Sequence, residues 1–176
     1  MTSYRRDEGR TDGAEVRACV AADLPVVRAL LIETWHATYD RWLGADTVRD
    51  ISATWHSELQ LAAQVSRPDS LFLVAEDGAG MLGTAFAHVL VDEAVEIGRL
   101  YVRPIAQRLG IGKALLTALT AGFPDADQFL LDVEPRNGLA ISFYQRHGFR
   151  VTGSGVDGGG SGLSHLRMTW QRPPSR

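Results

Sequence analysis

The chain has little of what would commit it to secretion, to a membrane or to nucleic acid. It has a single cysteine, so no intramolecular disulfide can form, and we expect a reducing, cytoplasmic compartment. The polar N-terminal segment lacks the apolar stretch of a secretory signal, and no later apolar run is long enough to span a bilayer, so no membrane partner is expected. The formal net charge of −3 is spread over residues of both signs, which argues against nucleic acid as a partner.

What is present suits one globular domain. A chain of 176 residues buries about 70 % of the surface that its unfolded form exposes, so neither a metal nor a disulfide is needed for stability. Residues 1–13 are highly charged with almost nothing to bury, and we expect them to form a flexible tail. Residues 14–171 are expected to form the domain, and residues 172–176 a second tail. We expect Cys19 to be a buried apolar side chain.

The spacing of apolar residues predicts an α/β fold with one mixed sheet and helices on its faces. Polar–apolar alternation and short apolar runs predict strands, and apolar residues three and four apart predict helices. In chain order we predict strand 15–20, a helix from 24 capped by Asp23, helix 46–65, strands 70–75, 81–91 and 95–102, helix 110–121, strand 129–133, helix 137–147, a strand from 149 and a closing strand 163–170. The strand 129–133 is almost uniformly apolar, which predicts cover on both faces.

The segment 153–162 is dominated by glycine and serine. It has too little apolar surface to offset the entropy of ordering it, so we expect a mobile loop. Two roles stay open for it: a lid over the bound acceptor, or a plain linker between the last two strands.

The segment Gln107–Lys113 joins a predicted strand to a predicted helix and contains Gly110 and Gly112. Glycines at such a junction let backbone amides approach a ligand, because no Cβ stands in the way. The first amides of a helix have no intrahelical acceptor and lie at the positive end of the helix dipole, which favours a pyrophosphate. The alternative is that the glycines serve close packing alone.

Two common nucleotide-binding patterns do not fit this turn. A dinucleotide fingerprint needs glycine or alanine three residues after Gly112, where the chain has Leu115. A P-loop needs glycine at the position of Gln107 and serine or threonine at the position of Ala114.

Two segments resemble the signatures of the GCN5-related N-acetyltransferases (GNATs). The run 100–116 contains Gln107-x-x-Gly110-x-Gly112 and is similar to the acetyl-CoA strand, loop and helix of that family. The run 137–149, with its Asn, Ala, Phe-Tyr and Gly-Phe, is similar to the second signature. The resemblance implies a twisted, mainly antiparallel mixed sheet of about seven strands flanked by about four helices. It also implies transfer of an acetyl group from acetyl-CoA directly to a primary amine, small or peptidic.

The resemblance further implies which residues hold acetyl-CoA, with no metal. The amides of 109–113 are expected to bind the pyrophosphate, and the backbone of Leu100 and Val102 to pair with the pantetheine arm. Asn137 is expected to face that arm, with helix capping as the alternative. The implied cofactor-binding residues are Leu100, Tyr101, Val102, Gln107, Arg108, Leu109, Gly110, Ile111, Gly112, Lys113, Asn137 and Tyr144.

Tyr144 is the expected general acid, because a phenol with a pKa of about 10 can protonate a thiolate whose conjugate acid has a pKa near about 8.5. A core aromatic packed beside Phe143 is the alternative. Glu96 is the expected base, since an ammonium ion cannot attack a thioester. It shares strand parity with Leu100 and Val102, so its carboxylate is expected on the face of the pantetheine contacts.

Other assignments of the base stay open. His88, Asp132, Glu134 and His147 are weaker candidates, a solvated carboxylate is the bland explanation for Glu96, and a water relay would need no single base.

Trp35, His36, Tyr39 and Trp42 gather near the end of the first helix, where GNAT members commonly bind the acceptor. We expect Trp35, Tyr39 and Glu96 to contact the substrate, and a partly acidic aromatic pocket would suit a cationic amine. Packing of these aromatic residues against the sheet is the alternative.

Two further functions and one assembly stay open. The chain would be an acyl-CoA-binding sensor domain if it binds without turnover, or an acyltransferase for a longer acyl-CoA. A homodimer is an expected assembly for the family.

Overall fold

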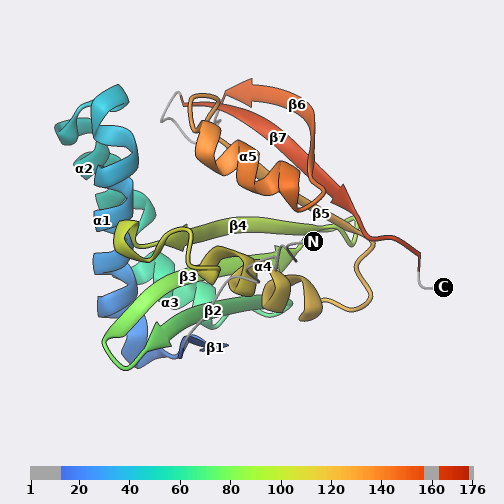
Figure 1. Cartoon of the computed structure of the whole chain (residues 1–176), viewed down its shortest axis with the longest axis horizontal. Coiled ribbons are helices and arrows are strands. Elements are labelled where there is room, and N and C mark those ends of the chain that lie inside the picture. The colour runs from blue at the N-terminus through green and yellow to red at the C-terminus, as the bar shows by residue number, and fades with distance from the viewer. Residues whose placement is uncertain (1–12, 157–162, 175–176) are drawn as a thin grey trace, which may run out of the picture.

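The computed structural model describes residues 13–156 and 163–174. Its strands form one sheet in the order β1-β2-β3-β4-β5-β7-β6, antiparallel except where β4 meets β5 (Figure 1). The strands are β1 Glu15–Ala18, β2 Ser70–Asp77, β3 Gly80–Val89, β4 Val95–Val102, β5 Gln128–Val133, β6 Arg150–Val156 and β7 Ser164–Gln171. The predicted seven-stranded mixed sheet is confirmed.

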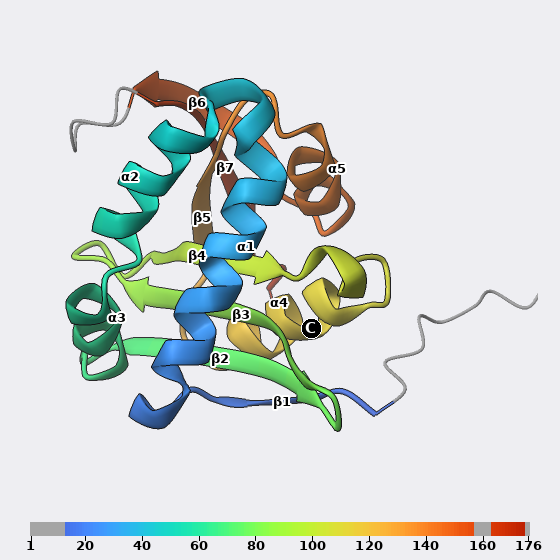
Figure 2. The same ribbon diagram turned by 90° about the vertical axis from the view of Figure 1, so that its left-hand side faces the viewer.

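Helices cover both faces of the sheet (Figure 2). They are α1 Leu24–Leu43, α2 Ala45–Trp55, α3 Glu58–Val65, α4 Ile111–Ala121 and α5 Gly138–Arg146, with short 3-10 turns at Ala21–Asp23 and Pro104–Ala106. Leu115 of α4 and Tyr144 of α5 belong to one buried cluster, and Leu30 of α1 and Leu61 of α3 belong to another. Neighbouring residues of the central strands alternate between these clusters, so the sheet separates two cores.

The single helix predicted over 46–65 is two helices. The chain bends at His56 and Ser57, where Ser57 has extended backbone angles and its Oγ accepts a hydrogen bond from the Gln60 N–H at 3.4 Å. Serine in this position begins a new helix because its side chain satisfies an amide that has no intrahelical acceptor. The described chain therefore has five helices rather than four.

The predicted cap at Asp23 is also wrong. Asp23 is itself helical in backbone angles and makes no side-chain bond to α1, because its carboxylate accepts from the Val20 amide at 2.9 Å and from Arg17. Arg17 also donates to Glu76 at 2.6 Å, so these charges tie β1 to β2. The Arg17 guanidinium holds the pKa of Asp23 below its usual range.

Cys19 is buried, as predicted, with 7 % of its surface exposed. Burial raises the pKa of its thiol to about 11, so the thiolate that reacts as a nucleophile is not formed near neutral pH. Cys19 therefore serves as an apolar side chain in the core beneath α1.

Two segments expected to be irregular are partly ordered. Residues 153–156 belong to β6 and pair with β7, and the rest of the predicted loop lies outside the described residues. Arg172, assigned to the tail, donates to the carbonyls of Thr120 and Phe123 at 2.7 and 2.9 Å. It thereby satisfies carbonyl groups at the C-terminal end of α4.

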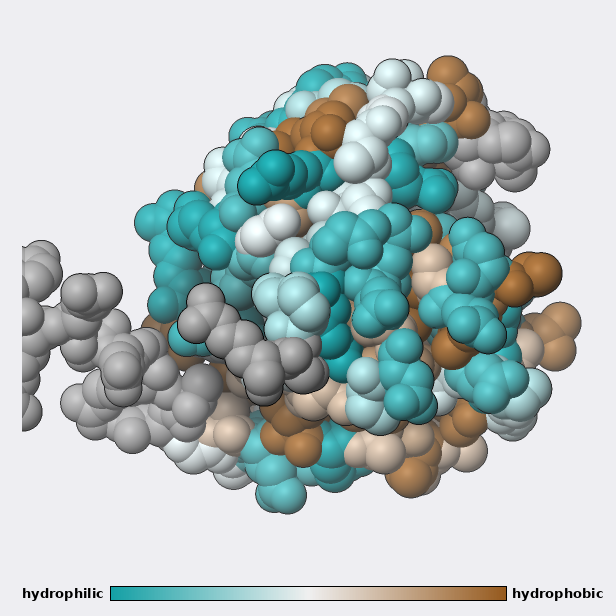
Figure 3. Space-filling model, turned by 90° about the vertical axis from the view of Figure 1, so that its right-hand side faces the viewer, coloured by the Kyte–Doolittle hydropathy of each residue, from teal (hydrophilic) through white to brown (hydrophobic). Residues whose placement is uncertain are grey.

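None of the described helices is both long enough and apolar enough to cross a bilayer. Figure 3 shows one face of the molecule, where hydrophobic residues lie in separate groups among hydrophilic ones. Scattered exposed hydrophobic residues of this kind are ordinary.

β4 and β5 are neighbours over a short distance only. They pair at Val95↔Phe129 and Glu96↔Leu130, and no further pair is found between them in the described chain. Figure 2 shows the two strands diverging beyond this point. The divergence opens the middle of the sheet.

Candidate active site

The turn between β4 and α4 presents backbone amides at a helix N-terminus. Gly110 precedes α4 with φ +85°, a left-handed conformation that glycine adopts without strain. The Ala114 N–H donates to the Gly110 carbonyl at 2.9 Å, so the amides of 111–113 precede the first intrahelical bond. The side chain of Gln107 donates to the Val102 carbonyl at 3.2 Å and closes the turn.

Packing alone does not require glycine at position 112. A Cβ there would lie 3.4 Å from the ring of Phe143 on α5 and 3.8 Å from the Leu100 side chain, which are ordinary van der Waals distances. Arg108 and Lys113 are exposed on the same turn. Backbone amides, the dipole of α4 and two cations thus surround one place, an arrangement that suits an anion.

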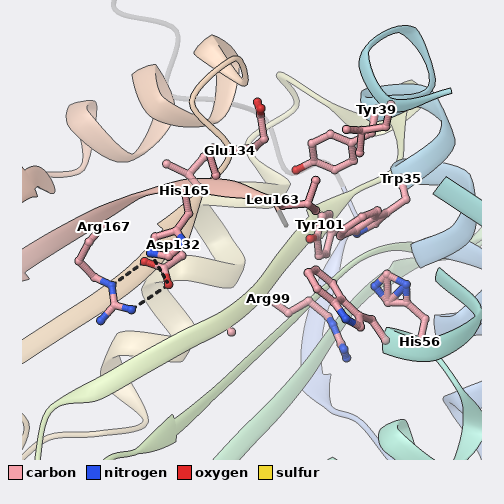
Figure 4. A pocket seen from close by; sticks show the side chains of 15 residues that line it. Trp35, Tyr39, His56, Arg99, Tyr101, Asp132, Glu134, Leu163, His165 and Arg167 are labelled. Atoms are coloured by element: carbon pink, nitrogen blue, oxygen red, sulfur yellow. Dashed lines mark hydrogen bonds and ion pairs between the residues drawn. The ribbon is translucent and has the colours of Figure 1, made fainter. Parts of the chain in front are cut away.

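A pocket of about 450 Å³ lies where β4 and β5 diverge, on the face of the sheet that α1 covers (Figure 4). It collects side chains from α1, α2, β4, β5 and β7. The lining residues are Trp35, Tyr39, Leu43, Trp55, His56, Gly98, Arg99, Tyr101, Asp132, Val133, Glu134, Leu163, Ser164, His165 and Arg167. Its volume is within the range of small-molecule sites.

The structure brings two of the predicted acceptor residues, Trp35 and Tyr39, into this pocket. Their rings lie 4.7 Å apart, and the ring of Trp35 meets that of Trp55 at 5.4 Å. Trp42 does not line the pocket. Its ring lies between two guanidinium groups, those of Arg41 at 4.3 Å and Arg136 at 5.5 Å, so it joins α1 to the segment after β5.

His36 also lies outside the pocket. Its Nδ1 is 2.8 Å from the carboxylate of Asp40, one turn further along α1. Of the four side chains grouped from the sequence, Trp35 and Tyr39 therefore line the pocket, whereas His36 and Trp42 do not.

The acidic side chains of the pocket are already neutralised. Asp132 accepts two hydrogen bonds from Arg167, at 2.5 and 2.8 Å, and Glu134 accepts from Arg136 at 2.6 Å. β5 is covered on both faces over 129–131, as predicted, because Phe129, Leu130 and Leu131 are all buried, but Asp132 is exposed between buried neighbours. A paired carboxylate attracts a cation less, so the expected partly acidic pocket is only formally acidic.

The predicted location of Glu96 is wrong. Gly98 has no partner on β3, because Ile97 pairs with Ala87 and Arg99 with Phe86. This β-bulge reverses the alternation of side chains along β4.

Residues on the two sides of the bulge show the reversal. Val95 and Ile97 belong to the core beneath α4, as do Leu100 and Val102 beyond the bulge. The Glu96 carboxylate lies on the opposite face, 3.6 Å from Nε2 of His88, and does not line the pocket.

Tyr144 is buried on α5. Its ring lies 5.2 Å from that of Phe143 and 5.5 Å from that of Phe149, so it contributes to the core as well as to any chemistry. Burial raises the pKa of its phenol, and the neighbouring Tyr101 raises it further. The Tyr144 phenol therefore stays protonated over the physiological range and is a hydrogen-bond donor.

Asn137 caps α5, since its Oδ1 accepts from the Ala140 amide at 3.1 Å. Burial raises the pKa of the Tyr39 phenol, and the Asn137 side chain opposes that rise. Asn137 thus lies between the start of α5 and the aromatic wall of the pocket.

Several lining residues were missed from the sequence. Arg99 and His56 are buried at 7 % and 2 % exposure. One signal could have revealed Arg99: it follows Gly98 inside an otherwise apolar strand, and a glycine inside a strand often marks a bulge. His56, Trp55 and His165 gave no local signal. No group of three or more potential metal ligands occurs among residues 13–156 and 163–174.

Comparisons with known proteins agree with this arrangement. A model of the acetyltransferase (GNAT) domain matches residues 68–151, from just before β2 into β6. Peptidyl-lysine N-acetyltransferase YiaC of Escherichia coli K12 is 26 % identical over 138 residues, or 77 % of this chain and 83 % of that protein.

Solved structures share the fold. The PaiA N-acetyltransferase of Thermoplasma acidophilum, in complex with coenzyme A, has a TM-score of 0.81 at 24 % identity, over 90 % of this chain and 99 % of that one. The ribosomal-protein-S18-alanine N-acetyltransferase of Escherichia coli has a TM-score of 0.68 at 22 % identity, over 93 % and 96 %.

Fold and family match together define an acyltransferase with an acetyl-CoA-binding fold. Residues 68–151 are thus a match to the GNAT acetyltransferase domain, and the described chain as a whole has the GNAT fold.

Proposed function

We propose that the chain transfers the acetyl group of acetyl-CoA directly to a primary amine held in the pocket between α1 and β7. The observation that carries the proposal is the shared position of two features along β4. The turn 107–113, which suits an anion, follows the C-terminal end of β4. The pocket opens where β4 diverges from β5. A ligand that extends from the turn along the free edge of β4 would reach the pocket.

The donor is proposed to be held mostly by main chain. The amides of 109–113 would bind the pyrophosphate, and Arg108 and Lys113 would add charge to the phosphates. After Glu96, β4 forms no further pairs with β5 in the described chain. The backbone groups of 100–102 on that edge could therefore form hydrogen bonds with the amides of pantetheine. Asn137 and Tyr144 would complete the wall on the side of α5.

Acetyl-CoA would supply an activated acyl group. In the transfer, the amine nitrogen forms a bond to the acetyl carbon as the carbon–sulfur bond breaks, and one proton moves from nitrogen while sulfur gains one. Tyr144 is proposed to donate the proton to sulfur, since its phenol is kept protonated by burial.

Glu96 is proposed to accept the amine proton through water. Glu96 lies close to the pocket but does not line it. Glu96 pairs with Leu130, and the residues two positions further along each strand, Gly98 and Asp132, line the pocket. A bridging water would connect the two places. The carboxylates of Asp132 and Glu134 are already engaged by Arg167 and Arg136, so Glu96 is preferred to them as the proposed base.

The acceptor is proposed to be a small-molecule or peptide amine. The related proteins named above act on peptidyl lysine and on an alanine of a ribosomal protein, and both acceptors are amines. A homodimer stays a prediction, which analytical ultracentrifugation would test.

Release of free CoA thiol on mixing the protein with acetyl-CoA and a panel of amines tests the proposal, with products identified by mass. We expect thiol release that depends on the amine and a product heavier by one acetyl group. Binding of acetyl-CoA without turnover of any amine would indicate the sensor function instead. Thermal shifts with acetyl-, propionyl- and succinyl-CoA would reveal a preference for a longer acyl chain.

Replacing Glu96→Gln tests the proposed base. We expect kcat to fall about 10-fold, less than the roughly 100-fold or more typical of direct proton transfer because the contact is indirect, with no change in acetyl-CoA affinity. Asp92→Asn, on the exposed turn before β4, is the matched control. Equal kcat in Glu96→Gln and wild type would remove Glu96 from the mechanism.

A further inference from the structure

We propose that the acceptor amine also carries a carboxylate, as a free amino acid does, and that Arg99 and the indole N–H of Trp35 bind this carboxylate. The inference rests on the proposed function, which it makes more specific by naming the substrate class.

Arg99 is a buried cation without an acidic partner. Its side chain comes from β4 into the wall of the pocket, and 7 % of the residue is exposed (Figure 4). Its Nη1 donates to Oε1 of Gln64 at 2.8 Å, and its guanidinium lies 5.6 Å from the ring centre of Phe72. No described carboxylate lies within ion-pair distance of it. A buried charge is costly unless paired, which points to an anion supplied by a ligand.

A second group in the same wall lacks a well-formed hydrogen bond. Nε1 of Trp35 is buried and forms none with the described residues, although its interaction with the Tyr101 hydroxyl opposes the rise that burial causes in the pKa of Tyr101. Nδ1 of His56 is likewise buried without a hydrogen-bond partner among the described residues. The rings of Trp35 and His56 lie 5.2 Å apart. An indole N–H can only donate, and a buried donor without an acceptor is destabilising. Arg99 and Trp35 therefore both favour an acceptor group, and a carboxylate supplies two such oxygens.

The other charges of the pocket do not compete for this carboxylate. Arg167 is held by Asp132 and Arg136 by Glu134, so Arg99 is the unpaired cation among the described pocket residues. One planar guanidinium matches one carboxylate, whereas a phosphate dianion would leave net negative charge. A polycation would meet only neutralised acids and an unpaired arginine. The observed charges thus favour an amine with a single carboxylate.

A matched substrate series tests the inference on the wild-type protein. Each of several L-amino acids is compared with its carboxamide and with its decarboxylated amine, and CoA release is measured for all. We expect kcat/KM to be about 10- to 100-fold higher for at least one free acid than for its two derivatives, the range for a hydrogen bond to a charged group.

Two outcomes separate this inference from the proposed function. If carboxamides or decarboxylated amines are acetylated as well as the free acids, the carboxylate site is wrong while the acetyltransferase function stands. If no amine of any kind releases CoA, the proposed function fails and the carboxylate site fails with it.

Variants locate the effect in the pocket. Arg99→Gln should remove the preference for free acids over their carboxamides, mainly by raising the KM for the free acids. Arg49→Gln, the same replacement on the exposed side of α2, is the control and should keep the full preference.

Trp35→Phe keeps an aromatic ring and removes the indole N–H. We expect it to reduce the preference for free acids about threefold, and it provides a second test if Arg99→Gln does not fold. An unchanged preference in both folded variants would overturn the assignment.

Discussion

The proposed donor side, which is the turn before α4, and the proposed acceptor side, which is the pocket between α1 and β7, differ in what they are made of. The turn before α4 presents backbone amides, and its key residues fall within Gln107–Lys113. The pocket is formed by side chains from five separate elements, several of them buried and polar. Recognition by main chain needs a short, continuous segment with glycine at chosen places. Recognition by side chains needs distant segments to meet, and it is there that the pKa values of His56 and Arg99 are shifted.

The most severe test of the donor side is Gly112→Asp. The new Cβ would lie 3.4 Å from Phe143, and the carboxylate would bring negative charge to the N-terminus of α4, where the phosphates are proposed to bind. We expect calorimetry to detect no acetyl-CoA binding, a loss of more than about 4 kcal/mol. Gly78→Asp, where a Cβ meets nothing within 4 Å, should bind as wild type does. Unchanged affinity in Gly112→Asp would refute the placement of the phosphates.

Acid should weaken the acceptor side through His56. Burial lowers the pKa of this histidine to about 4 from 6.5, so between these values the unfolded chain takes up a proton that the folded chain does not. Stability is fully retained above pH 6.5 and falls as the pH drops toward 4, by about 3 kcal/mol in total. Urea unfolding of wild type and His56→Gln at pH 7 and pH 4 measures this. The difference in unfolding free energy between wild type and His56→Gln should change by that amount between the two pH values. The same pH dependence in both proteins would show that His56 is not buried as a neutral group.

Tyr144→Phe should separate binding from chemistry. The ring contacts with Phe143 and Phe149 remain, so we expect normal folding and normal acetyl-CoA affinity. Loss of the phenolic proton should lower kcat about 100-fold, or about 2.7 kcal/mol. Stopped-flow detection of thiol release, with binding followed by calorimetry, gives both quantities. Full activity would leave Tyr144 with the core-packing role alone.

The smallest expected effect is that of Lys113→Gln, which tests how much an exposed side chain adds to the backbone amides. We expect the Kd for acetyl-CoA to rise about threefold at low salt, since exposed ion pairs are weak, and the difference to shrink at high salt. Glu58→Gln on α3 changes charge elsewhere and should leave the Kd unaltered. A loss as large as that of Gly112→Asp would mean that side-chain charge dominates on the donor side as well.

Most of the sheet was predictable from sequence, because the strands and α4 have regular apolar periods. The predictions of helix 46–65 and of the Glu96 side-chain direction failed because one residue interrupts the regular spacing of side chains in each segment. Ser57 starts a new helix inside an apparently continuous one, and Gly98 introduces a bulge that moves Glu96 to the other face. Neither residue changes the apolar pattern enough to reveal the break. The Ser57 hydrogen bond is local, to the Gln60 amide, whereas the bulge at Gly98 depends on how β4 pairs with β3.

The amino-acid order alone was enough to predict the donor. Two glycines at a strand-to-helix junction act through their own backbone, so Gln107–Lys113 and the second signature at 137–149 carry that information locally. The pocket depended on tertiary structure. Arg99 is an unpaired buried cation only because β4 bulges, Asp132 is held by Arg167, and the bend before Ser57 brings His56 beneath Trp35. Charge and hydrogen bonding between distant segments exist only after folding, and the proposed choice of amine depends on them.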